Sequence, residues 1–167
     1  AWMALSRGGR GVAGAWALIE GPPQPWLFLA AALCIQLRLL ANMIDGLVAV
    51  EGGRGGPTGA IWNEFPDRIE DSLFLVAAGY AAALPWLGWL AALLAATCAY
   101  VRLLGGTLGM PQDFGGPMAK PHRMAALTIG CLVAIAWPQA IAVALGAIAA
   151  GTAIWHHPGM RVPIRWV

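Results

Sequence analysis

Residues 26–50, WLFLAAALCIQLRLLANMIDGLVAV, decide the fold, because an apolar run of this length is typical of a membrane-spanning helix. About 20 residues of α-helix cross the hydrocarbon core of a bilayer, and this run meets that length. Arg38, Asn42 and Asp45 interrupt it. Polar groups at membrane depth are costly and mark candidate sites. The stretch therefore predicts a transmembrane helix that carries a polar site.

Composition extends this interpretation to the whole chain of 167 residues, which is short enough to form a single domain. Hydrophobic residues make up 59% and charged residues 11%, where a soluble globular protein carries about 25% charge. A soluble globule and a disordered tail are therefore excluded. The ten basic and eight acidic residues are scattered, so no nucleic-acid partner is expected and the lipid bilayer is the predicted environment.

Glycine and proline clusters divide the chain into four or five expected spans. These are 26–50, 60–84, a third span from the turn at Pro85 to about 104, a fourth from about 122 to the turn at 137–139, and a fifth ending near 155. Residues 1–20 contain the sequence SRGGRG, which predicts the stump of one helix followed by a short interfacial helix, in a natural protein trimmed at its N-terminus. We expect one all-α integral-membrane bundle, with 1–25 as the stump, 26–156 as the bundle and 157–167 as a cytoplasmic tail.

The distribution of Lys and Arg predicts the orientation of the bundle. Arg7 and Arg10 lie on one face. The opposite face collects the other basic residues near the span ends: Arg54, Arg68, Arg102, Lys120, Arg123, Arg161 and Arg165. This face is predicted to lie in the cytoplasm.

Two polar stripes lie near the cytoplasmic ends of the first two strong spans, at the spacing that places residues on one helix face. The first stripe consists of Asn42, Asp45, Gly46 and Ala49. The second consists of Gly59, Asn63, Asp67 and Asp71. A short loop joins these helices, so they are expected to be antiparallel neighbours whose stripes face each other. Carboxylate and amide oxygens without a His or Cys cluster suit a hard cation such as Mg²⁺, Mn²⁺ or Ca²⁺.

These stripes resemble the signature of the CDP-alcohol phosphatidyltransferase family, Asp-x2-Asp-Gly-x2-Ala-Arg, about eight residues, then Gly-x3-Asp-x3-Asp. The chain has Asn42-x2-Asp45-Gly46-x2-Ala49-Val50, eight residues, then Gly59-x3-Asn63-x3-Asp67. The continuation DRIED, residues 67–71, is similar to the phosphatidylinositol-phosphate synthase branch. The basic segment from Tyr100 to Arg123 also resembles that branch.

The resemblance implies a six-helix membrane enzyme, with the sixth helix at the trimmed N-terminus. It implies a transferase of phospholipid synthesis that moves a phosphatidyl or phospho-alcohol group from a CDP-linked donor to an alcohol acceptor and releases CMP. Mg²⁺ or Mn²⁺ would be held by Asn42, Asp45, Asn63, Asp67 and Asp71, and Asp67 would also act as base. Substrate would contact the remaining candidates: Gly46, Ala49, Gly59, Arg68, Arg102, Lys120 and Arg123. The expected location is a bacterial cytoplasmic membrane, and a homodimer is one expected assembly.

The chain departs from the signature at three positions. Asn42 and Asn63 stand where the family has aspartates, and Val50 stands where it has arginine. An asparagine offers a carbonyl oxygen but no negative charge, so metal affinity is expected to fall. The acids available to compensate are Glu51, Glu64 and Asp71. A shifted register through Asn63, Asp67 and Asp71 would keep two aspartates but lengthen the loop, so the register with Gly59 is preferred.

Three alternatives stay open. Asp45 and Asp67 could be structural carboxylates paired with Arg38 or Arg68, as buried acids often are, and the basic residues at Arg102, Lys120 and Arg123 could serve topology alone. A catalytically silent relative that binds lipid or nucleotide, or scaffolds a membrane partner, would explain the two asparagines. A cation transporter would also use intramembrane acids, but these lie near one face and not at the midplane.

Overall fold

The chain folds into six α-helices, described by a computed structural model that covers residues 2–20, 24–51, 59–108 and 118–155. At residues 2–8, 10, 45–51, 59–64 and 155 the description extends to the helical backbone only. The helices are α1 (Trp2–Glu20), α2 (Trp26–Glu51), α3 (Gly59–Ala81), α4 (Pro85–Thr107), α5 (Lys120–Ala134) and α6 (Ala140–Trp155). The predicted all-α class and the turns at Pro85 and at 137–139 are confirmed.

The N-terminal segment differs from the expectation of an interrupted stump. α1 is one continuous helix through Gly8, Gly9 and Gly11, and it packs against α2 and α3. A Cβ at Gly14 would lie 2.6 Å from Cε1 of Phe74 in α3, so this position needs a glycine for close packing. The prediction of a break was wrong because a glycine can also admit a neighbouring helix. A Cβ at Gly11, inside the predicted break, would lie 3.0 Å from Cγ of Glu70 in α3. The sixth helix is thus α1 itself, inside the chain.

Fewer helices meet the length and composition of a membrane span than the four or five expected. In the described residues, two stretches do so, Trp26–Ile44 and Pro85–Thr107. α6 is apolar but has 16 residues, and α5 has 15 residues with Lys120 and Arg123 in its first turn. At about 1.5 Å per residue they extend roughly 23 Å, less than the ~30 Å hydrocarbon core. α3 falls short because of its charged residues.

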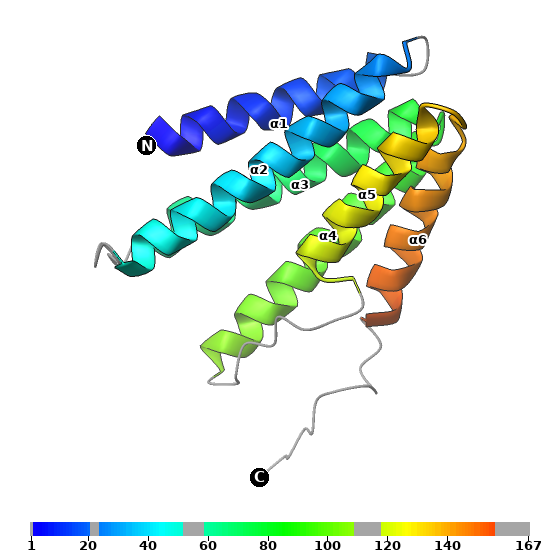
Figure 1. Ribbon diagram of the computed structural model, residues 1–167. Coiled ribbons are helices and arrows are strands. Elements are labelled where there is room, and N and C mark those ends of the chain that lie inside the picture. The colour runs from blue at the N-terminus through cyan, green and yellow to red at the C-terminus, as the bar shows by residue number, and fades with distance from the viewer. Residues whose placement is uncertain (1, 21–23, 52–58, 109–117, 156–167) are drawn as a thin grey trace.

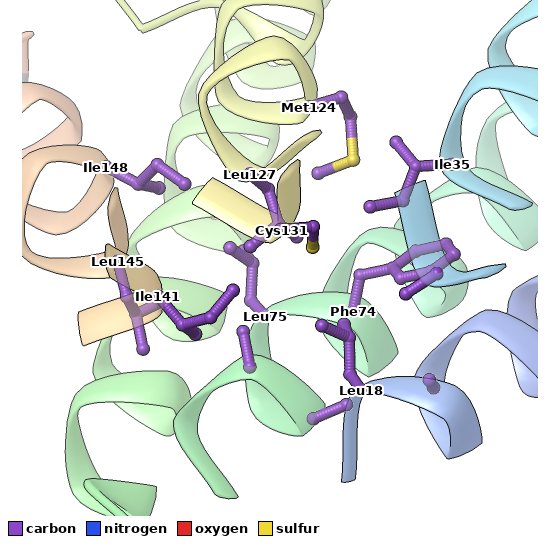
Figure 2. Close-up of a cluster of buried hydrophobic side chains, with 14 of the residues drawn as sticks. Leu18, Ile35, Phe74, Leu75, Met124, Leu127, Cys131, Ile141, Leu145 and Ile148 are labelled. Carbon is purple, nitrogen blue, oxygen red and sulfur yellow. The ribbon is translucent and has the colours of Figure 1, made fainter. Parts of the chain in front are cut away.

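The helices form a bundle in which α5 lies between α2 and α6, and α4 packs against α3 and α6 (Figure 1). The buried core joins side chains from all six helices. Figure 2 shows part of it, with Leu18, Ile35, Phe74, Leu127 and Ile141. Among the described residues, α2 and α3 do not pack backbone to backbone. Long side chains bridge them instead, and these side chains form the candidate site.

Candidate active site

The acidic stripe of α3 is buried. Asp67, Glu70 and Asp71 are 6%, 3% and 2% exposed, and their spacing places all three on one face of the helix. Burying an ionised carboxylate is costly unless it is paired and hydrogen-bonded. Three such groups on one face therefore require cations from the neighbouring helices.

Arg38 of α2 is the first of these cations and is fully buried. Its NH2 group donates to Oδ1 of Asp71 at 2.7 Å and to Oδ1 of Asp67 at 3.3 Å. Its Nε donates to Glu70. The guanidinium also lies over the ring of Phe74, 5.9 Å from the centroid. One arginine therefore connects α2 to Asp67, Glu70 and Asp71.

The second oxygen of Asp67 has different partners. Asn42, one helical turn after Arg38, donates from Nδ2 to Oδ2 at 2.6 Å. Lys120, the first residue of α5, forms an ion pair with the same oxygen. Asp67 thus presents Oδ1 to Arg38, and Oδ2 to Asn42 and Lys120. The prediction that the two polar stripes face each other is confirmed for Asn42 and Asp67.

Arg123 completes the cluster from the first turn of α5. It is 3% exposed, its NH2 lies 3.9 Å from Oδ2 of Asp71, and its NH1 donates to the carbonyl of Met118 at 2.8 Å. Together with Arg38 and Lys120 it balances the three buried acids Asp67, Glu70 and Asp71. The N-terminal end of a helix also carries partial positive charge, which favours the nearby carboxylates.

The other predicted basic residues gather beside this cluster. Arg68 of α3 and Arg102 of α4 are half-buried, and their like charges act on Arg123. Arg68 also lines a cavity of about 320 Å³ between α3 and α4, whose wall is otherwise mainly apolar and includes Trp89. Arg68, Arg102 and Arg123, from three helices, therefore lie close to one another. This is the arrangement that a phosphate-bearing ligand requires.

Several predicted site residues have side chains that lie outside the described part of the structure. On α2 these are Asp45, Gly46 and Ala49, and on α3 they are Gly59 and Asn63. Both helices are continuous through these positions. Their helical registers are therefore those expected from the sequence, and Gly59 is the first residue of α3. The backbone of α3 also contains Pro66, which removes one amide donor directly before Asp67.

The donor chemistry of the cluster fits a divalent cation only in part. Asn42 and Asp67 offer amide and carboxylate oxygens, the ligands that Mg²⁺ and Mn²⁺ prefer. Glu70 and Asp71 are enclosed by Arg38 and Arg123, and the described residues contain no group of three or more His, Cys, Asp or Glu side chains placed to hold a metal ion. Among the described side chains, the fitting set is thus Asn42 and Asp67.

Sequence reasoning underestimated two residues. Arg38 was considered only as a structural partner, and Glu70 was not singled out. The signal for Arg38 was its place in an apolar run, four residues before Asn42, because a charge at that depth requires partners. The structure shows the Asp67–Arg38 pair that the structural alternative predicted. The same carboxylate nevertheless faces the motif residue Asn42.

The chain is similar to a protein of known function and to a protein of known structure. No family model matches it. It is 32% identical over 135 residues to an archaetidylinositol phosphate synthase of Aeropyrum pernix, covering 78% of this chain and 68% of that protein. The chain belongs to the CDP-alcohol phosphatidyltransferase family. Its sequence pattern is that of the phosphatidylinositol-phosphate synthases.

A solved structure supports the fold of this CDP-alcohol phosphatidyltransferase. The crystal structure of Mycobacterium tuberculosis phosphatidylinositol phosphate synthase, with CDP-DAG bound, superposes with a TM-score of 0.74. The match covers 91% of this chain and 81% of the other at 21% identity. The family and the two long apolar helices together support an integral membrane location.

Proposed function

We propose that this phosphatidyltransferase moves a phosphatidyl or phospho-alcohol group from a CDP-linked donor to an alcohol acceptor and releases CMP, as a step of phospholipid synthesis. The observation that carries the proposal is the meeting of three helices at one oxygen. Oδ2 of Asp67, the last residue of the motif, contacts Asn42 of α2 and Lys120 of α5. A carboxylate beside cations is suited to a reaction that combines proton transfer with binding of phosphate.

In the proposed reaction, Oδ2 of Asp67 accepts the proton of the acceptor hydroxyl. The hydroxyl oxygen forms a bond to the phosphorus on the lipid or alcohol side of the pyrophosphate, the bond to the bridging oxygen breaks, and CMP leaves with the electron pair. Lys120 exchanges the carboxylate for a substrate phosphate, and Arg68, Arg102 and Arg123 bind the remaining phosphate charge. This exchange exposes Oδ2 at the moment when it is needed.

A divalent cation fits this reaction at the residues named above. Asn42, Asp45, Asn63 and Asp67 would hold Mg²⁺ or Mn²⁺, and Gly46, Ala49 and Gly59 would leave room for the ligand beside the two helices. When bound, such an ion neutralises pyrophosphate charge. With two aspartates in place of four, weaker metal binding is expected. Asp71 would act through its pairing with Arg38 and Arg123.

CDP-diacylglycerol is the proposed donor, since the solved relative was crystallised with CDP-DAG. The proposed site lies at the bundle end where α3 and α5 begin and α4 ends (Figure 1). We place this end at the cytoplasmic face of a bacterial membrane, because the basic residues collect there. A homodimer is the proposed assembly, on the analogy of the family.

The test is CMP release by purified protein in lipid nanodiscs, given CDP-diacylglycerol, Mg²⁺ or Mn²⁺, and a panel of alcohols and phosphorylated alcohols. Wild-type protein should release CMP with one acceptor, and Asp67→Asn should lower turnover about 10³-fold, the contribution expected of a general base. Gln36→Ala is the matched control, because Gln36 bridges α2 to Thr128 of α5 away from the acids. Turnover retained by Asp67→Asn would contradict the mechanism.

A second candidate, a silent relative that binds without turnover, is favoured by one observation. Each of the three described acids of α3 already contacts a protein cation, and Asn42 removes a further charge. Equilibrium binding of CDP-diacylglycerol without CMP release from any acceptor would support this candidate. Metal-dependent CMP release would exclude it.

A further inference from the structure

We propose that Arg38 is a positioning residue that holds the Asp67 carboxylate in its reactive orientation. This inference rests on the proposed function, because it concerns the carboxylate to which that function assigns proton transfer. Arg38 lies outside the family signature and is assigned no role by it. It acts through Asp67 and Asp71 and has no direct part in the chemistry.

The contacts of the guanidinium fix its orientation. NH2 donates to the main-chain carbonyl of Asp67 at 3.2 Å as well as to its Oδ1, and also to Oδ1 of Asp71. Nε donates to Glu70, and NH1 is directed at Sδ of Met124, 3.7 Å away. A planar guanidinium has its donors in a rigid fork. With every nitrogen engaged, it cannot rotate without losing several of these contacts together.

The orientation of Arg38 determines that of Asp67. Arg38 occupies Oδ1, so the carboxylate plane is set from the interior of the bundle. Oδ2 is left on the side of Asn42 and Lys120, where the proposed reaction takes place. A proton acceptor must lie within hydrogen-bond reach of its substrate, and a small displacement of the acceptor lowers the reaction rate strongly.

Charge also distinguishes Arg38 from the other cations of the cluster. Among the described residues, it alone contacts Asp67, Glu70 and Asp71 together, whereas the described ion pairs of Lys120 and Arg123 each reach one acid. Without it, the carboxylates on one face of α3 would repel each other, and Asp67 would turn away from its neighbours. Lys120 is free to move to substrate only if Arg38 stays with the acids.

The first variant is Arg38→Lys, which keeps the charge but lacks the planar fork. A lysine cannot contact Asp67 and Asp71 with the geometry of the fork. We expect kcat to fall about 100-fold, the cost of a displacement near 1 Å. KM for CDP-diacylglycerol should not change, and thermal unfolding should show a folded protein. A loss in kcat without a change in KM reports an interaction made in the transition state.

The controls separate positioning from simple stability. Gln36→Ala removes a 2.8 Å hydrogen bond from α2 to α5 and should keep the wild-type kcat. Should Arg38→Lys not fold, the neutral pair Arg38→Gln with Glu70→Gln replaces it, because this pair removes one positive and one negative charge. The double variant should lose kcat as Arg38→Lys does, while Gln36→Ala should not.

Two results are decisive and distinguishable. If the wild type releases CMP and folded Arg38→Lys, or the double variant, turns over at the wild-type rate, the positioning role is wrong and the proposed function stands. If the wild type releases no CMP from any acceptor, the proposed function fails and this inference fails with it. A lower yield of folded protein with unchanged kcat per folded molecule would identify Arg38 as purely structural, which also overturns the proposal.

Discussion

The middle of α3 and its C-terminal end meet their neighbours in opposite ways. At Asp67–Asp71 the helix stands away from α2, and charged side chains fill the space. At Gly79 it crosses α4 so closely that a Cβ there would lie 2.7 Å from the Cα of Gly88. Ion pairs with defined geometry hold α3 to α2, whereas close backbone packing holds α3 to α4. Chemistry therefore lies where the backbones are apart, and tight packing lies where side chains are absent.

The largest effect is expected at the shape-dependent end. In Gly88→Leu the new Cβ would lie 2.8 Å from the carbonyl oxygen of Leu75 and 2.9 Å from the Cα of Gly79, and backbone atoms cannot easily move aside. We expect little folded protein, read as loss of the monodisperse peak in size-exclusion chromatography. Gly146→Ala is the matched control, because nothing lies within 4 Å of that Cβ position. If Gly88→Leu folds like this control, close packing does not hold α3 to α4.

A smaller but clear effect is expected at the charged middle of α3, where Asp71 lies. Asp71→Asn removes one partner of Arg38 and leaves the buried guanidinium less compensated. Breaking a buried pair in this way costs about 3–5 kcal/mol of unfolding free energy. Thermal unfolding in detergent should show the loss. Ser72→Ala serves as control, since its hydroxyl bonds only the carbonyl of Arg68 within the same helix. Equal stability of both variants would show that the charges contribute nothing net to the fold.

The smallest effect is expected in the turn that joins α3 to α4. Ala83 has φ of 55°, in the left-handed region. An L-residue there pays about 1–2 kcal/mol relative to glycine. After the entropy cost of glycine, Ala83→Gly should therefore raise the free energy of unfolding by less than about 1 kcal/mol. The thermal midpoint should rise slightly. A lower midpoint would show that Ala83 has compensating contacts.

Much of the fold could be read from the sequence, because hydrophobic length and helical period are local properties. The helices α2, α3 and α4 and the turn at Pro85 follow from apolar runs and punctuation. α1 could not be predicted in this way. Gly11 and Gly14 are explained by the side chains of Glu70 and Phe74, which come from a distant part of the chain.

In the candidate site, too, local spacing predicted some contacts and not others. The spacing of Asn42 and Asp67 in their stripes indicated the family and predicted that these residues would meet, and the 2.6 Å contact agrees. The basic residues of α5 were expected near the substrate without any indication of which acid they would contact. Lys120 reaches Asp67 across 53 positions of sequence, a distance over which no periodicity carries information.

The sequence by itself determined an all-α membrane protein with two facing polar stripes and the motif spacing of its family. The tertiary structure decided that Arg38 lies between α2 and α3, that Asp67 has one oxygen toward Arg38 and one toward Lys120, and that α1 is unbroken. The physical reason is how far apart in sequence the interacting residues lie. Burial and helical period depend on neighbours in sequence, whereas the partner of a buried charge depends on which helices pack around it.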